Sequence, residues 1–217
     1  MKYAVVCAGG PDSEIADLTE FHHKDTVFIG ADRGALHLLQ RGIVPLEAVG
    51  DFDSVSKSEY DEIAAAVRII GRFRSEKNET DTELAVDRAL SYGPECVILT
   101  GVTGGRLDHM ESALHLLYRL QIAHNDTSFS IRNGTNELFI LTPGSYQVTS
   151  DDRFKYISFF SFNGVVSGLT LTGFKFEMVD ATLETGMTLF TSNELAEEVC
   201  TISFHEGICL MVRSSDS

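Results

Sequence analysis

The sequence predicts an N-terminal α/β domain, in which helices cover both faces of a parallel sheet, followed by a C-terminal antiparallel β-sandwich. Short apolar runs alternate with helical patterns over residues 1–127, whereas polar and apolar residues alternate within short segments over residues 128–217. Turn dipeptides such as Asn133-Gly134 separate the later segments. A strand near Phe129 is also able to complete the first domain's sheet, which leaves the boundary open by several residues.

The elements of the first domain follow from periodicity. Strands are expected at 3–8, 26–30, 47–49, 67–70 and 96–100, and helices at 34–41, 56–66, 81–91 and 107–123. The last helix is the clearest, because Met110, Ala113, Leu114, Leu117 and Leu120 fall on one face. In a parallel sheet the loops that lead from strands into helices gather at one edge, where ligands bind.

The second domain is expected to be built from strands joined by turns. Its strands are predicted at 129–132, 136–141, 145–149, 155–162, 201–204 and 207–212. The dipeptides Pro143-Gly144 and Asn163-Gly164 are typical of the turns between them. Only residues 193–197 suggest a helix, and it is short.

Composition and charge limit the classes of partner and the compartment expected for this chain. The net charge of −15 at pH 7 disfavours nucleic acid as a partner, because the chain repels a phosphate backbone. No apolar run approaches the roughly 20 residues of a membrane span, and residues 1–10 are interpreted as a first strand rather than a signal peptide. The four cysteines form no Cys-x-x-Cys pair and are expected to be reduced thiols. We therefore expect a cytoplasmic protein that binds neither membranes nor nucleic acid.

The segment Gly50-Asp51-Phe52-Asp53-Ser54 carries two carboxylates at a predicted strand end. Turn and helix-cap chemistry explains one such aspartate well. Asp32 and Asp81 occupy equivalent strand-to-helix loops, so four carboxylates share one sheet edge. Clustered carboxylates raise each other's cost of ionisation unless a cation lies among them. The sequence therefore predicts a hard divalent metal at Asp32, Asp51, Asp53 and Asp81, and a metal-dependent phosphoryl-transfer enzyme.

The segment 100–109 is rich in glycine and leads into the clearest helix. Gly101, Gly104 and Gly105 permit backbone amides to approach phosphate oxygens, and Arg106 offers a positive charge. No Gly-Lys-Ser/Thr follows, so the segment is not a Walker A loop, and a glycine turn without a ligand stays an alternative. The segment Gly9-Gly10-Pro11 is a weaker candidate for phosphate binding than residues 100–109, because it lacks the spacing of a Rossmann dinucleotide site.

Together these segments resemble bacterial thiamin pyrophosphokinases. The resemblance rests on residues 30–35, 50–54, Thr80-Asp81-Thr82-Glu83-Leu84-Ala85 and Gly104-Gly105-Arg106-Leu107-Asp108-His109, with 173–176 and 191–194 in the second half. It spans nearly the whole chain. It implies that ATP and thiamin give AMP and thiamin diphosphate with Mg²⁺, or with Mn²⁺ in its place, in a homodimer whose site lies between the α/β domain of one chain and the β-domain of the other.

The resemblance also implies roles for individual residues. Asp51, Asp53 and Asp81 would be catalytic, with Asp32 completing the metal site and Asp81 accepting the hydroxyl proton. ATP and its phosphates would be bound by Arg33, Thr100, Gly101, Gly104, Gly105, Arg106, Asp108 and His109. Thiamin would be bound by Thr80, Asp81, Phe176, Thr191, Ser192 and Asn193. The chain departs from the family where Asn78 replaces a more familiar Asp, with Glu79 as a substitute, and at Leu195, where an aromatic residue is more familiar.

Other functions stay open at this point. A pyrophosphokinase for another small alcohol, such as a hydroxymethyl pterin, would share the first domain. A non-catalytic thiamin or nucleotide sensor would not require all four aspartates. A nucleotide-sugar transferase would use Asp51 and Asp53 as its metal motif, but no feature of the second domain suggests a sugar.

Overall fold

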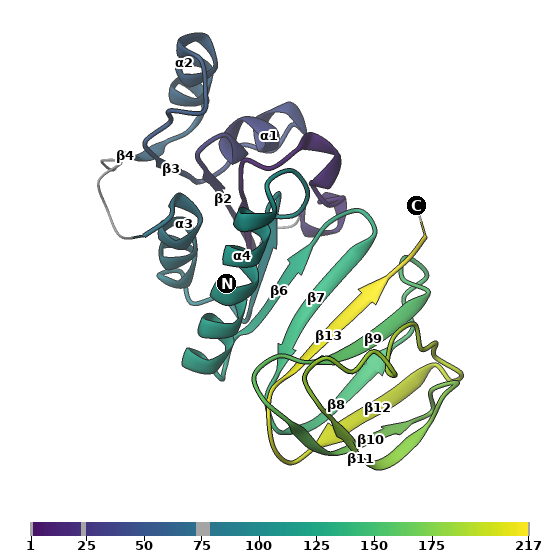
Figure 1. The fold of residues 1–217 in the computed structure, drawn as a ribbon. Helices are drawn as coiled ribbons and strands as arrows, with labels where there is room; N and C mark the ends of the chain where they lie inside the picture. The colour runs from purple at the N-terminus through teal and green to yellow at the C-terminus, as the bar shows by residue number, and fades with distance from the viewer. Residues whose placement is uncertain (1, 23–24, 73–78, 217) are drawn as a thin grey trace. The chain divides into compact units, whose positions relative to one another are not determined.

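The computed structural model describes residues 2–22, 25–72 and 79–216 (Figure 1). The chain divides into two units, Met1–Gly134 and Thr135–Ser217. The first is the α/β part and the second is made of strands, as the sequence predicts. Asn78, where the sequence departs from the family pattern, lies outside the described residues.

The first unit contains a parallel sheet in the order β4-β3-β2-β1-β5-β6. Its strands are β1 (Tyr3–Cys7), β2 (Thr26–Ala31), β3 (Glu47–Gly50), β4 (Ile69–Arg72), β5 (Cys96–Thr100) and β6 (Ser128–Arg132). The chain runs outward from β1 to β4 and then returns to the other side of β1 at β5. The strand order therefore reverses between β1 and β5, and such a reversal is where open α/β sheets bind ligands.

Four helices accompany this sheet in the described part of the first unit: α1 (Gly34–Gln40), α2 (Lys57–Ala66), α3 (Asp81–Leu90) and α4 (Leu107–Ala123). Ser56 and Thr80 cap α2 and α3 in capping boxes with Glu59 and Glu83. Both α1 and α3 pack on β1 and β2, and α4 packs on β6 (Figure 1). Two short 3₁₀ turns, η1 (Asp12–Glu14) and η2 (Thr19–Phe21), were not predicted from the sequence.

The second unit is the predicted antiparallel sandwich. In one layer β13 (Cys209–Ser214) pairs with β7 (Asn136–Leu141) and β9 (Tyr156–Ser161). The other layer has the order β11-β10-β12-β8, formed by Met178–Leu183, Val166–Thr172, Val199–Phe204 and Gly144–Thr149. Buried residues from both layers, including Phe159 and Leu169, form one core. Alternation places these side chains inside, as the sequence indicated.

Several expectations from the sequence were wrong. The strands β10 and β11 were missed, because Gly168 adopts a positive φ of 74° with shifted pairing beside it and Val179 is 81% exposed, so neither strand alternates regularly. The short helix at 193–197 is absent, and Asn193 instead forms a β-bridge with Ile157. The strand predicted at 67–70 begins only at Ile69.

The sequence left the boundary between the two units open by several residues, with a strand near Phe129 able to complete the first sheet. β6 pairs in parallel with β5, and the first unit consequently extends to Gly134 rather than ending at 127. All four cysteines are free thiols, and Cys7, Cys200 and Cys209 are buried. Within the described ranges, no helix has the length and apolar character needed to cross a membrane.

Candidate active site

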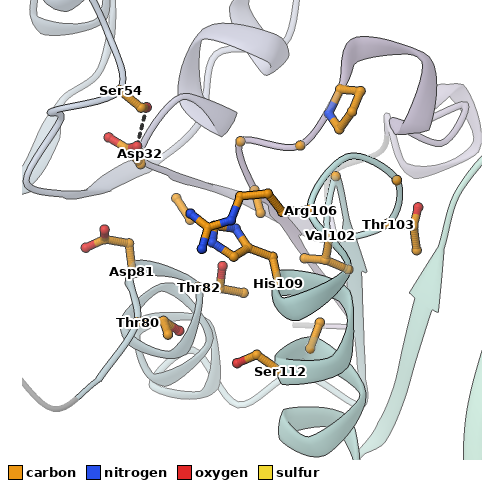
Figure 2. A pocket seen from close by; sticks show the side chains of 18 of the residues that line it. Asp32, Ser54, Thr80, Asp81, Thr82, Val102, Thr103, Arg106, His109 and Ser112 are labelled. Carbon is orange, nitrogen blue, oxygen red and sulfur yellow. Dashed lines mark hydrogen bonds between the residues drawn. The ribbon is translucent and has the colours of Figure 1, made fainter.

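A cavity of about 530 Å³ opens at the carboxyl ends of the first unit's strands (Figure 2). Its walls come from the loops after β1 and β5, the end of β2, the start of α3 and the first turns of α4. The lining residues are Ala8, Gly9, Gly10, Pro11, Ala31, Asp32, Ser54, Thr80, Asp81, Thr82, Gly101, Val102, Thr103, Gly104, Arg106, His109, Ser112, Ala113 and Leu116. The cavity therefore lies at the reversal of strand order between β1 and β5.

Three of the predicted metal ligands lie together at this edge. One carboxylate oxygen from each of Asp32, Asp51 and Asp53 lies within 4.8 Å of the others. Phe52, between Asp51 and Asp53, has a positive φ of 61°, and its buried ring packs edge-on against Tyr60 with 5.3 Å between the ring centroids. The buried ring and the left-handed turn hold the two flanking carboxylates near one point.

Asp32 has one buried carboxylate oxygen, Oδ1. Its Oδ2 accepts a hydrogen bond from Ser54 Oγ, whereas its buried Oδ1 accepts none from any residue in the described ranges. Burial raises the pKa of Asp32, and the nearby charges of Asp81 and Asp51 raise it further against the effect of Ser54. A buried oxygen without a donor, among carboxylates that repel each other, fits a hard divalent cation such as Mg²⁺.

Asp81 does not belong to this group of three, although its charge acts on Asp32. It is the first residue of α3 and lines the same cavity as Asp32. Glu83 closes the capping box by accepting from the backbone N–H of Thr80 at 2.6 Å, and Arg119 of α4 donates to the same Glu83 carboxylate. The start of α3 is thus fixed to α4, and Asp81 faces the cavity near the acidic group (Figure 2).

The glycine-rich loop forms the wall opposite the acidic residues. Gly101 and Gly104 have φ values of 70° and 71°, and a Cβ on Gly101 would lie 2.5 Å from the carbonyl oxygen of Ala8. Only glycine fits this close approach. Arg106 lines the cavity and pairs with Asp108 at 2.5 Å, and this hydrogen bond lowers the pKa of Asp108. His109 is the third residue of α4, and its ring lies beside the cavity (Figure 2).

Four residues assigned to ATP by the resemblance do not line the cavity: Arg33, Thr100, Gly105 and Asp108. Thr100 is fully buried, and its Oγ1 accepts from the backbone N–H of Ala16 at 2.8 Å. Arg33 donates to the carbonyl oxygen of Ser54 at 3.2 Å and to Glu59 at 3.1 Å. The guanidinium of Arg33 therefore binds the acidic loop through the Ser54 carbonyl, on the side away from the cavity lining.

Some lining residues were missed by sequence reasoning. Gly9, Gly10 and Pro11 were given little weight because they lack Rossmann spacing, yet they follow β1 at the same edge. Ser112 lines the cavity one helical turn after His109, so the i,i+3 spacing on the predicted helix was a usable signal. Thr82 follows Asp81 in the first turn of α3.

The residues expected to bind thiamin in the second unit form a small cluster of their own. Asn193 is 4% exposed; its Oδ1 accepts from the backbone N–H of Phe176 at 3.0 Å and its Nδ2 donates to the Phe176 carbonyl at 2.9 Å. Phe176 is 61% exposed. Thr191 Oγ1 donates to the carbonyl of Thr188, and the exposed Ser192 has a φ of 57°. The side-chain amide of Asn193 thus fixes the backbone of Phe176 through two hydrogen bonds.

Comparisons with known proteins match both halves of the chain. The family model described as "Thiamin pyrophosphokinase, catalytic domain" matches residues 18–130, and "Thiamin pyrophosphokinase, vitamin B1 binding domain" matches residues 145–209. A curated thiamine pyrophosphokinase from Bacillus subtilis (strain 168) is 39% identical over 218 residues, covering 100% of both chains.

Solved structures agree with these matches. A crystal structure of the thiamine pyrophosphokinase from Bacillus subtilis has a TM-score of 0.93 and 38% identity, and it covers 100% of each chain. The thiamin pyrophosphokinase from Geobacillus thermodenitrificans has a TM-score of 0.89 and 37% identity, covering 100% of this chain and 99% of that one. The chain therefore belongs to the thiamin pyrophosphokinase family.

Proposed function

We propose that this enzyme transfers the pyrophosphoryl group of ATP to the hydroxyethyl oxygen of thiamin, giving thiamin diphosphate and AMP. The observation that carries the proposal is the group formed by Asp32, Asp51 and Asp53, which reaches the cavity through Asp32, with a glycine-rich loop and Arg106 also lining that cavity. Phosphoryl transfer depends on positioning and on neutralising charge; Arg106 and a cation held by the three carboxylates would supply the positive charge. The names of its relatives support thiamin as the acceptor.

The acidic group would hold Mg²⁺, or Mn²⁺ in its place, through Asp32, Asp51 and Asp53. When bound, the cation supplies positive charge to the phosphate oxygens of ATP. The backbone around Gly101 and Gly104 and the guanidinium of Arg106 would bind the remaining phosphate charge, since all three line the cavity.

Asp81 is our candidate for the group that accepts the proton of the thiamin hydroxyl. It lines the cavity, it lies outside the group of three carboxylates, and the capping box around Thr80 fixes its backbone. A carboxylate that lines the cavity is placed to accept a proton as the oxygen attacks phosphorus.

We also propose that the enzyme is a homodimer in which the second unit of one chain supplies thiamin contacts to the first unit of the other. The exposed ring of Phe176, held by Asn193, offers a face to the cationic ring of thiamin. Ser192 and Thr191 lie on the same segment. The four free cysteines support a reducing compartment such as the cytoplasm, and the charge of −15 argues against nucleic acid as a partner.

A mixture of two inactive variants tests the shared site. Asp53→Ala removes a first-unit carboxylate, and Phe176→Ala removes a second-unit ring, so each homodimer lacks both copies of one part. Hybrids formed by refolding the two together would contain one intact site. We expect such mixtures to regain about a quarter of wild-type turnover, by random pairing of one intact site in half of the dimers. No recovery from hybrids shown to have formed would exclude the shared site.

The proposed reaction is tested by following AMP in the presence of ATP. We expect AMP to form only when thiamin and Mg²⁺ are both present, in amounts equal to thiamin diphosphate. Hydroxymethyl-dihydropterin and nucleotide sugars serve as competing substrates. Higher turnover with the pterin would overturn the choice of thiamin, and tight binding of thiamin and ATP without AMP would identify a sensor.

A further inference from the structure

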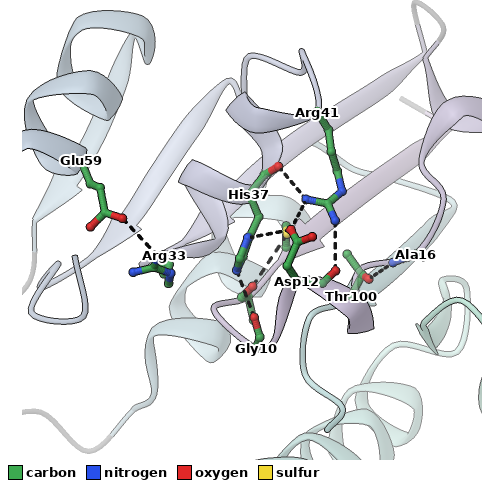
Figure 3. A network of polar contacts seen from close by, with 10 residues as sticks. Gly10, Asp12, Ala16, Arg33, His37, Arg41, Glu59 and Thr100 are labelled. Atoms are coloured by element: carbon green, nitrogen blue, oxygen red, sulfur yellow. Dashed lines mark hydrogen bonds and ion pairs between the residues drawn. The ribbon is translucent and has the colours of Figure 1, made fainter. Parts of the chain in front are cut away.

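His37 is a buried polar group beside the cavity that the proposed reaction does not use. It lies in the middle of α1 and is 5% exposed, and its Nε2 lies 3.0 Å from the carbonyl oxygen of Gly10 (Figure 3). A carbonyl oxygen only accepts hydrogen bonds, so the proton of the neutral ring belongs on Nε2. Burial lowers the pKa of His37 and keeps the ring neutral near pH 7.

Gly10 is a wall of the cavity, and its backbone is held from two sides. Its N–H donates to the carbonyl of Gly101 at 2.8 Å, while its own carbonyl accepts from His37. A Cβ at Gly10 would lie 2.3 Å from the Gly101 oxygen, so the two loops touch here without room for a side chain. The loops after β1 and β5 therefore meet at Gly10, and α1 fixes that meeting point through His37.

A second contact joins the same helix to the same loop. Arg41 donates to Asp12 Oδ1 at 2.8 Å, to the Asp12 carbonyl at 3.1 Å and to the His37 carbonyl at 3.1 Å (Figure 3). The Asp12 carboxylate also lies 3.4 Å from His37 Nδ1, but Nδ1 carries no proton in this tautomer and donates no hydrogen bond to it. The hydrogen bond from Arg41 lowers the pKa of Asp12, so this carboxylate stays ionised as a partner for the guanidinium.

The other end of α1 holds the acidic loop. Arg33 precedes His37 by one helical turn and donates to the carbonyl of Ser54. Ser54 in turn donates to Asp32. One face of α1 thus contacts both sides of the cavity: the acidic loop through Arg33, and the glycine loops through His37.

We propose that His37 is a positioning residue for nucleotide binding, which fixes the Gly10 backbone and through it the junction of the loops after β1 and β5. His37 does not line the cavity, so it acts through Gly10 and not on the substrate. The proposal rests on the proposed function in one respect, that ATP occupies this cavity. Loss of the Nε2–H donor would let the Gly10 peptide turn and would disturb the wall that faces the phosphates.

The test compares His37→Leu, which fills the space without a donor, with His37→Gln, whose side-chain N–H reaches a similar position. Binding of a non-hydrolysable ATP analogue with Mg²⁺ is measured by calorimetry, and KM is measured for ATP and for thiamin. We expect His37→Leu to weaken nucleotide binding and raise the KM for ATP about tenfold, the effect of one lost buried hydrogen bond. The KM for thiamin and kcat should change by less than about twofold, and His37→Gln should restore most of the affinity.

Leu38→Ala is the matched control, because Leu38 is a fully buried neighbour on α1 that packs in the core. It should lower the Tm while leaving the KM for ATP near that of the wild type. Arg41→Met removes the hydrogen bonds from Arg41 to Asp12. Because the Arg41 side chain is partly exposed, this change leaves the core intact and gives a second test in a chain that folds. We expect it to raise the KM for ATP about threefold.

Unchanged nucleotide affinity in a folded His37→Leu chain overturns the proposal, as does unchanged affinity in Arg41→Met if His37→Leu does not fold. An equal rise in the KM for ATP in Leu38→Ala would also overturn it, because general loosening of α1 would then explain the effect. Weakened analogue binding in a protein that forms no AMP with thiamin would support the role of His37 and remove the proposed reaction instead.

Discussion

Asp53→Ala is expected to lower kcat for AMP formation on the order of a hundredfold to a thousandfold, because it removes charge that would hold the proposed cation against the phosphates. Asp53 shares a group of three carboxylates with Asp32 and Asp51, whose oxygens lie within 4.8 Å of one another. With Asp53 absent, the remaining pair would bind Mg²⁺ more weakly. The measurement is the rate of AMP release over a range of Mg²⁺ concentrations, with thiamin and ATP saturating.

The control for this variant is Asp61→Ala. Asp61 is an exposed carboxylate on α2 that pairs with Lys57 at 2.9 Å, and its loss changes the net charge by the same amount. It should leave both kcat and the Mg²⁺ dependence unchanged. Direct titration with Mn²⁺ gives a second reading: Asp53→Ala should bind the ion more weakly than Asp61→Ala. Near-normal turnover of Asp53→Ala would remove Asp53 from the metal site.

Glu47→Ala is expected to destabilise the fold by about 1–3 kcal/mol, since it removes the hydrogen bonds of a buried carboxylate while its partner Arg88, 46% exposed, is solvated in its absence. Glu47 lies on β3 and is 1% exposed; Arg88 donates to its two oxygens through Nε and Nη2 at 2.8 Å each, and the hydroxyl of Tyr92 donates to it as well. This group joins α3 to the sheet. Urea denaturation at pH 7 measures the free energy of unfolding of the variant and the wild type.

The Glu47 carboxylate also makes the free energy of unfolding depend on pH. The hydrogen bonds from Arg88 lower the pKa of Glu47 below its ordinary value of 4.5, although burial opposes them. A lowered folded-state pKa means that the stabilisation is complete above about pH 4.5 and is lost as the pH falls through the folded-state value. The difference in unfolding free energy between wild type and Glu47→Gln should therefore shrink below pH 4.5.

Glu111→Gln is the control for Glu47, because Glu111 is exposed and pairs with His115 on the surface of α4. Its effect should stay within about 0.5 kcal/mol at every pH. If Glu47→Ala and Glu111→Gln have the same free energy of unfolding, the hydrogen bonds from Arg88 and Tyr92 to the Glu47 carboxylate do not stabilise the fold.

Much of the α/β unit was predictable because its elements have strong local signals. The helix predicted at 107–123 has those limits in the structure, since one apolar face and a preceding glycine turn define it. Asp32, Asp51 and Asp53 were predicted to meet because parallel strands end at one edge, and they do. Capping-box spacing at Thr80 and Glu83 also gave the start of α3 correctly.

The direction of a side chain at a strand end was harder to predict. Thr100 ends β5, and whether its hydroxyl faces a ligand or Ala16 depends on η1 and the segment after it, which gave no clear signal. Arg33 resembles a phosphate ligand in the sequence, but the position of α2 gives it Glu59 as a partner. β11 was missed because its exposed face carries Val179, so polarity did not mark the strand.

The left-handed turn at Phe52 ties the acidic loop to the order in which the chain folds. Its ring packs in a cluster with α1, β3 and α2, so the turn is stable only after these elements have assembled. Before assembly, Asp32 and Asp51 are separated along a flexible chain and present no common point to a cation. A divalent ion bound there would therefore add its binding free energy to the native state alone, and enzyme stored with the ion would resist unfolding better than enzyme stored in chelator.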